Sequence, residues 1–249
     1  MRRIRLTLSY DGTGFHGWQK QPGLATIQGT LEQAVSEIEG APVHVAGSGR
    51  TDAGVHAVAQ VAAISIENPI PLPNLKKALN RLLPCAIRVL AVADAPLDFH
   101  PRYHALAKTY EYRIVRTEVC SPFERHYAYH HPYPLDTARM LELAPMLEGE
   151  HDFTAFAASD ERDALGLSKI RTIFRSELEE VDGRLIYRVR GSGFLKHMVR
   201  NIVGTLLEAG KGNLDTEGLR TLLRSRGRTG CGPTAPARGL FLISVEYQM

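Results

Sequence analysis

The order in which helix and strand patterns follow one another constrains the fold of this chain more than any other feature of its sequence. A strand with one buried face alternates apolar and polar residues, whereas an amphipathic helix repeats apolar residues every three or four positions. By these criteria the first part of the chain holds a strand, a helix, two strands, a helix and a strand, over residues 4–9, 26–39, 43–46, 57–66, 72–83 and 87–92. This is the order of a ferredoxin-like unit.

A similar order returns in the second part of the chain, as a repeat of pattern and not of residues. It predicts a strand, a helix, two strands, two helices and a strand, over residues 108–115, 137–147, 170–181, 184–189, 194–209, 216–224 and 241–247. Between the two series, the segment FHPRYHAL carries a proline and loses its periodicity, which marks a boundary. We therefore expect an α+β fold of two ferredoxin-like (RRM-like) halves, over residues 1–103 and 104–249.

Two sheets of this kind each leave edge strands unpaired, and exposed edges favour aggregation. We expect the halves to join edge to edge into one largely antiparallel sheet, with a central cleft between them. The sequence contains no Gly/Ser-rich linker, so we expect the halves to be packed together and not tethered.

Composition narrows the class of protein and its compartment. Hydrophobic residues make up 44% of the chain and charged residues 23%, which excludes disordered and fibrous proteins. No apolar run approaches the roughly 20 residues that span a membrane, and the basic start lacks the apolar stretch of a signal peptide. Three scattered cysteines without a CxxC pair suit a reducing compartment. We expect a soluble, cytoplasmic protein that does not bind a membrane.

The net charge of +3 does not by itself indicate a nucleic-acid partner. The basic residues do form two arginine clusters, at residues 2, 3 and 5 and at residues 220, 224, 226 and 228. Arginine grips phosphate with two parallel hydrogen bonds, so both clusters are candidates for phosphate contact. A solvated face is the commoner explanation of any single cluster, and it stays open here.

The most unusual segment is GSGRTDAGVH, residues 47–56, between two predicted strands. Its glycines let the backbone approach a bulky ligand closely, and small residues follow Asp52, which leaves its carboxylate accessible. In an extended chain, Arg50 projects from the same side as Asp52 and favours its ionised form. An ionised aspartate in a cleft acts as a nucleophile or a base. The alternative is a turn in which Asp52 only binds nearby amides.

Two further segments carry candidate substrate-binding residues. Tyr110 and Tyr112 project from one face of a predicted strand, where aromatic rings stack on unpaired RNA bases, although core packing explains such pairs more often. Lys196 and Arg200 project together from the edge of a buried helical stripe, so Arg200 is placed to meet a carboxylate. A surface arginine lying along apolar neighbours is the alternative.

Other chemistries find no support in the sequence. His126, His130 and His131 are close together but lack metal-ligand spacing, and a proline follows them. The chain has no dinucleotide fingerprint, phosphate-binding loop or nucleophile elbow. We therefore expect no metal and no cofactor.

Taken together, these segments resemble the TruA family of tRNA pseudouridine synthases over nearly the whole chain. The motifs that carry the resemblance in the first half are YDGT, FHGWQ, TIQG and GRTDAGVH, at residues 10–13, 15–19, 26–29 and 49–56. Those in the second half are KTY, HDF, Phe194 with MVR, and PA with GL, at residues 108–110, 151–153, 198–200, 236–237 and 239–240. Residues 157–169 depart from the pattern, and no role is carried over to them.

The resemblance implies the pseudouridine synthase fold and a homodimer that isomerises uridines 38, 39 and 40 in the anticodon arm of tRNA. It also implies that Asp52 is catalytic, that Tyr110 stacks on the target uracil, that Arg200 pairs with Asp52, and that Arg50 helps to extrude the base. The sequence leaves open whether Asp52 attacks the sugar or takes its proton. A non-catalytic RNA-binding protein and a nucleoside hydrolase are the rival functions.

Overall fold

A computed structural model describes residues 1–160, 166–225, 227 and 230–248. The chain divides into two compact units. Unit 1 contains residues 1–106 together with the described residues from 241 onward, and unit 2 contains residues 107–240. The last strand, which the sequence analysis placed in the second half, therefore lies in unit 1. The domain limits expected from the sequence, 1–103 and 104–249, stay a prediction.

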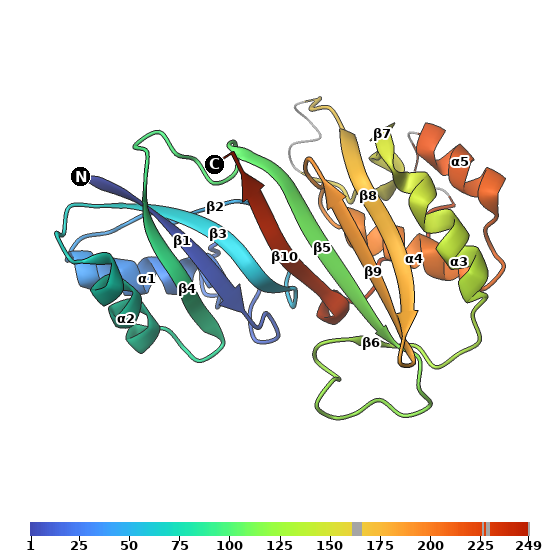
Figure 1. Cartoon of the computed structure of the whole chain (residues 1–249), viewed down its shortest axis with the longest axis horizontal. Coiled ribbons are helices and arrows are strands. Elements are labelled where there is room, and N and C mark those ends of the chain that lie inside the picture. The colour runs from blue at the N-terminus through green and yellow to red at the C-terminus, as the bar shows by residue number, and fades with distance from the viewer. Residues whose placement is uncertain (161–165, 226, 228–229, 249) are drawn as a thin grey trace. The chain divides into compact units, whose positions relative to one another are not determined.

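The sheet of unit 1 has the strand order β4-β1-β3-β10, formed by Ile87–Ala95, Arg2–Tyr10, His56–Ile66 and Leu240–Tyr247 (Figure 1). Strand β1 is antiparallel to both β3 and β4, and β10 is parallel to β3 with Phe241 opposite His56. The short β2, Ala46–Gly47, pairs with β3. Alternate residues of β1, from Ile4 to Tyr10, are buried, as the period of two in the sequence predicts.

Two helices complete the main core of unit 1. Helix α1, Ile27–Glu39, begins where the Thr26 hydroxyl accepts a hydrogen bond from the backbone N–H of Gly29. Helix α2, Leu72–Leu82, buries Leu75 and Leu79. A second apolar cluster contains Val61, Ala63 and Phe99, with the partly buried Ala95, Val245 and Tyr247 packed against it.

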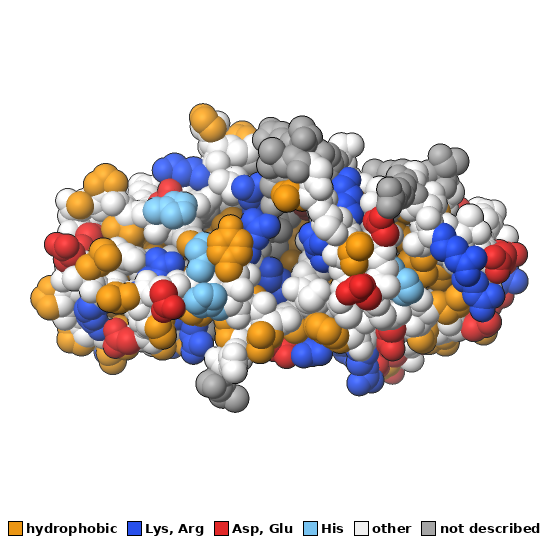
Figure 2. Space-filling model, turned by 90° about the horizontal axis from the view of Figure 1, so that it is seen from above, with side chains coloured by type: hydrophobic (Ala, Val, Ile, Leu, Met, Phe, Trp, Pro, Cys, Tyr) orange, Lys and Arg blue, Asp and Glu red, His pale blue; other side chains and the backbone are white. Residues whose placement is uncertain are grey.

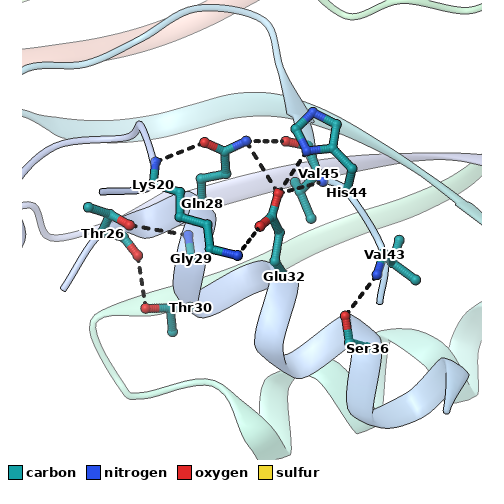
Figure 3. Close-up of polar contacts among 10 residues, drawn as sticks. All are labelled: Lys20, Thr26, Gln28, Gly29, Thr30, Glu32, Ser36, Val43, His44 and Val45. Carbon is teal, nitrogen blue, oxygen red and sulfur yellow. Dashed lines mark hydrogen bonds and ion pairs between the residues drawn. The ribbon is translucent and has the colours of Figure 1, made fainter. Parts of the chain in front are cut away.

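The sequence prediction of a strand over residues 43–46 is wrong for its first three residues, because side chains of α1 take their backbone groups (Figure 3). The N–H of Val43 donates to the Ser36 hydroxyl at 2.9 Å. The N–H of Val45 donates to the Glu32 carboxylate at 3.2 Å, and its carbonyl accepts from the Gln28 amide at 3.0 Å. With these groups satisfied locally, pairing begins only at Ala46.

The sheet of unit 2 has the strand order β5-β9-β8-β7, formed by Ala105–Val115, Arg184–Gly191, Ile170–Val181 and Gly149–Asp152, and all its neighbours are antiparallel. The short β6, Tyr129–His130, is parallel to β5. The helices of this unit are α3, Thr137–Leu143, α4, Met198–Gly210, and α5, Thr216–Arg224. Its single helical turns are η1, Ala144–Leu147, η2, Thr154–Phe156, and η4, Ala237–Gly239.

Helix α4 begins four residues later than the sequence pattern predicts. His197, just before it, has φ of 60°, in the left-handed region, so a continuous helix from residue 194 is excluded. The mixed composition of helices and mainly antiparallel strands confirms the α+β class. The central cleft expected between the halves stays a prediction.

Candidate active site

The segment between β2 and β3 carries Asp52 on a short turn. The backbone N–H of Val55 donates to the backbone carbonyl of Asp52 at 3.1 Å, and Gly54 between them has φ of 77°. Such a φ favours glycine. Asp52 is half-buried, whereas Arg50 and Ala53 are exposed. Unit 1 thus holds the carboxylate on a tight turn with small residues after it.

Residues 15–18 hold this turn from a neighbouring segment. The N–H of Trp18 donates to the carbonyl of Thr51 at 3.0 Å, and the N–H of Gly54 donates to the carbonyl of Phe15 at 3.3 Å. Between them Gly17 has φ of 83°, and a Cβ atom there would lie 2.6 Å from the carbonyl oxygen of Thr51. Only glycine allows so close an approach, which explains the FHGW motif in physical terms.

A buried polar network fixes the residues that flank Arg50. The side-chain amide of the fully buried Gln60 donates to the carbonyl of Gly49 at 3.1 Å, and its oxygen accepts from the Ser48 hydroxyl at 2.5 Å. On the other side, the hydroxyl oxygens of Thr51 and Tyr10 lie 2.9 Å apart. Burial raises the pKa of Tyr10 to about 12, so this hydroxyl keeps its proton. The sequence analysis missed Gln60, although a glutamine within an apolar strand pattern is the signal that could have found it.

His56, at the end of the motif, belongs to the core of unit 1. Its ring is 1% exposed and stacks on Phe241 at 4.7 Å. Its Nδ1 lies 3.1 Å from the N–H of Gly12 and 3.2 Å from the carboxylate of Asp11, two contacts that need opposite protonation states of Nδ1. The backbone N–H of Gly12 can only donate a hydrogen bond, so it needs an acceptor at Nδ1. The Asp11 carboxylate already accepts hydrogen bonds from the backbone N–H and the hydroxyl of Thr13. We therefore assign Nδ1 as the acceptor.

Strand β5 of unit 2 carries Tyr110. Its ring is 8% exposed and meets Phe194 edge to face, with centroids 5.0 Å apart and planes at 78°. Two residues along, Tyr112 is fully buried and donates its hydroxyl proton to the carbonyl of Pro236 at 2.7 Å. Burial raises the pKa of Tyr112 far above its usual range. Tyr112 is thus a core residue, and Tyr110 is the tyrosine with measurable exposure.

Arg200 lies in the first turn of α4, and the segment over residues 231–236 fixes it. Its Nε donates to the carbonyl of Ala235 at 2.7 Å, and the N–H of Ala235 donates to the carbonyl of Arg200 at 3.1 Å. One turn further, a Cβ atom at Gly204 would lie 1.8 Å from the carbonyl oxygen of Pro233. The sequence analysis noted residues 236–237 but missed the contact of this segment with α4, for which Gly204 within a strongly apolar helix is a signal.

Unit 2 also contains a cluster of charged side chains around Glu111 that lies apart from the predicted site residues. The Glu111 carboxylate pairs with Arg113 and Arg188, both at 2.8 Å. Burial raises the pKa of Glu111, but the hydrogen bonds from both guanidinium groups outweigh it and leave this pKa below its usual range. The cluster borders a cavity of about 410 Å³ whose lining includes none of the predicted site residues: Glu111, Arg113, Phe123, Glu124, Tyr127, Ala128, Arg184 and Ile186.

Members of both arginine clusters form ion pairs with acidic side chains, and phosphate contact by these clusters stays a prediction. Arg2 pairs with Asp94 at 3.1 Å, and Arg220 lies 3.4 Å from Glu217 in α5. Figure 2 shows basic and acidic side chains interspersed around α5. These pairs fit a solvated face at the α5 cluster. Arg226 and Arg228 lie outside the described residues, as do residues 161–165 of the departing segment.

The predicted site residues fall into two pairs. Asp52 and Arg50 belong to one segment of unit 1, whereas Tyr110 and Arg200 belong to unit 2. The pairing of Arg200 with Asp52 stays a prediction. Among the residues that the structure describes, no three histidine, cysteine or acidic side chains form a group that would hold a metal ion. Within the same residues, every helix is too short or too polar to cross a bilayer.

Comparison with known proteins identifies the family. The family described as tRNA pseudouridine synthase matches residues 7–104 and 143–248. A protein of Solibacter usitatus named tRNA pseudouridine synthase A is 68% identical over 99% of this chain and 100% of its own length. Proteins of the same name are 45% identical in Anoxybacillus flavithermus, over 99% of both chains, and 42% identical in Lacticaseibacillus casei, over 99% of this chain and 100% of the relative.

A solved structure of an archaeal box H/ACA sRNP Nop10-Cbf5 complex shares 13% identity over 82% of this chain and 43% of that chain, with a TM-score of 0.33, which is too low to inform the fold. The family match covers the Asp52 turn and the Arg200 helix but not residues 105–142, which include Tyr110, and the relatives align from end to end. The chain belongs to the tRNA pseudouridine synthase family.

Proposed function

We propose that this chain isomerises uridine to pseudouridine at positions 38, 39 and 40 in the anticodon stem-loop of tRNA, without a cofactor, and that Asp52 is its catalytic residue. The name of the 68% identical relative supports the reaction and the tRNA substrate. The observation that carries the residue assignment is the Asp52 turn, which neighbouring segments hold from both ends while the carboxylate stays partly accessible. Positioned groups of this kind lower a barrier because they need little reorganisation.

The reaction is an isomerisation in which one bond to the sugar replaces another. The bond between N1 of uracil and C1′ of ribose breaks, the uracil turns, and a bond between C5 and C1′ forms. C5 loses a proton and N1 gains one, so the atoms balance without a co-reactant. The Asp52 carboxylate promotes the first step either by attacking C1′ or by taking the proton at C2′. Both routes need the ionised carboxylate.

The other site residues have supporting roles in this proposal. Tyr110 stacks on the flipped uracil, and its hydroxyl lies near C5 to help remove the proton. Its edge-to-face contact with Phe194 holds the ring for this role. Arg200, whose Nε bond to Ala235 fixes the guanidinium, pairs with Asp52 and holds its carboxylate in place. Arg50 is exposed at the start of the turn, where it helps to extrude the target base from the stem.

The assembly and compartment complete the proposal. We expect a homodimer that acts in the cytoplasm and requires neither a metal nor a membrane. Sedimentation of the purified protein measures the first expectation, and turnover after treatment with a chelator measures the requirement for a metal.

The deciding assay uses tRNA tritiated at C5 of uridine. We expect the wild-type chain to release tritium without releasing free uracil. Asp52→Asn should abolish release and keep the affinity for tRNA, whereas Glu142→Gln, which removes one carboxylate from the exposed face of α3, should leave both unchanged. Free uracil would indicate a nucleoside hydrolase, and tRNA binding without either product would indicate an RNA-binding protein. Turnover by Asp52→Asn would refute the catalytic assignment.

A further inference from the structure

The loop after β4 is anchored firmly to the sheet of unit 1. Phe99 is 8% exposed within the second apolar cluster, and its ring meets that of Tyr247 at 5.2 Å. The Nε of Arg3 donates to the carbonyl of Phe99 at 3.0 Å, and the Tyr247 hydroxyl donates to the carbonyl of Pro101 at 2.7 Å. The backbone on both sides of His100 is therefore fixed to strands β1 and β10.

The turn that follows presents an aromatic ring to solvent. The N–H of His104 donates to the carbonyl of His100 at 3.1 Å, which closes the turn. The Nδ1 of His100 accepts from the N–H of Arg102 at 3.1 Å, which fixes the imidazole. The Tyr103 ring lies 4.3 Å from this imidazole, with planes at 35°, and yet Tyr103 is 74% exposed. One side of the ring is thus supported and most of its surface meets water.

A guanidinium lies beside this ring, and further basic groups act on the imidazole that supports it. The guanidinium carbon of Arg102 lies 5.8 Å from the centre of the Tyr103 ring. Burial lowers the pKa of His100, and the charges that add to this effect are those of Arg3, His104 and Arg102. The surroundings of Tyr103 therefore attract an anion.

Core packing does not account for this arrangement. A side chain with three quarters of its surface in water adds little apolar burial, whereas its neighbours Phe99 and Pro101 are buried. A supported ring beside a guanidinium has the features that recognise an unpaired nucleotide, whose base stacks on the ring while its phosphate meets the cation. A protein partner would use the ring but would gain less from the surrounding charge.

We propose that Tyr103, supported by His100 and accompanied by Arg102, is a binding site for an unpaired nucleotide of the RNA substrate, separate from the Asp52 turn. The base stacks on the tyrosine ring and the adjacent phosphate pairs with Arg102. The site rests on the proposed function only in that the RNA is tRNA. It contributes affinity and takes no part in the chemical step.

The test compares variants of the full chain in two binding assays and one turnover assay. The binding probes are a substrate tRNA and a single-stranded oligouridylate of about ten nucleotides, a length that one stacking groove can bind. Tyr103→Ala should weaken binding of both probes roughly 5- to 100-fold and raise KM with kcat unchanged. Tyr103→Phe keeps the ring and should bind like the wild type. Tyr133→Ala removes another exposed tyrosine, in unit 2, and should have no effect.

Several results would overturn the site. The proposal is refuted if Tyr103→Ala binds both probes as tightly as the wild type. It is also refuted if Tyr133→Ala loses as much affinity for the probes as Tyr103→Ala does. A change in sedimentation by Tyr103→Ala without a change in RNA affinity would assign the ring to a protein interface. Arg102→Gln should reduce the slope of log Kd against log salt by about one unit, and an unchanged slope would remove the phosphate contact. Failure of the proposed function is distinguishable, because a wild-type chain without tritium release would still report on the site through oligouridylate.

Discussion

Replacement of Gln60 by leucine tests whether the buried network holds the Asp52 turn. Gln60→Leu keeps a similar volume but removes the partner of the Gly49 carbonyl at 3.1 Å and one partner of the Ser48 hydroxyl at 2.5 Å. The Gly49 carbonyl is left unsatisfied, which costs about 1–3 kcal/mol, and the Ser48 hydroxyl loses one hydrogen bond, which costs about 0.5–1.5 kcal/mol. With some gain from the added apolar surface, we expect the free energy of unfolding to fall by about 2–4 kcal/mol.

The matched control is Ser48→Ala, which removes a single hydroxyl. The Gln60 oxygen then keeps the N–H of Val61 at 3.2 Å, so we expect a loss of only about 1 kcal/mol. Trp18 is the only tryptophan of the sequence, is buried in unit 1 and donates to Thr51, so its fluorescence during urea unfolding reports on this region. Equal unfolding midpoints for Gln60→Leu and the wild type would refute the reasoning.

Three further predictions concern unit 2. Gly204→Ala places a Cβ atom against the Pro233 carbonyl, so urea unfolding should show a loss of about 1–3 kcal/mol or more in the free energy of unfolding. The control Gly14→Ala adds a Cβ atom that meets nothing within 4 Å and should be neutral. Tyr110→Phe keeps the ring and should slow tritium release without weakening tRNA binding; an unchanged rate would exclude the hydroxyl from the mechanism. Because the folded-state pKa of Glu111 is lowered, its stabilising effect is present above the unfolded pKa of about 4.5 and is lost as pH falls through the lower folded value. Glu111→Gln should therefore flatten the stability profile measured by circular dichroism in this acid range, and an unchanged profile would contradict the assignment.

Local patterns predicted most helices and strands, because their causes lie within a few residues. The apolar spacing and Thr26 cap of α1 are an example, and the structure places this helix within one residue of the expected start. The strand expected over residues 43–46 shows the limit. Its backbone groups bind Glu32 and Ser36, which lie on the preceding helix, and no strand pattern reveals such competition. Likewise, the last strand was expected from its alternation, but its parallel pairing with β3 in unit 1 joins residues nearly two hundred positions apart.

The candidate site divides in the same way. Asp52 could be recognised from the sequence, because the small glycine and alanine residues beside this acidic residue are visible there. The groups that hold the site are distant: Trp18 binds the backbone of Thr51, and Ala235 binds both the backbone and the side chain of Arg200. In each case the partner contributes a backbone group, which every residue type possesses, so the identity of the partner leaves no signal. The sequence does show where such contacts need a residue without a side chain. Gly17 in unit 1 and Gly204 in unit 2 are at positions of this kind. Glycines whose added Cβ would strike a backbone carbonyl are therefore the positions from which the support of such a site is best inferred.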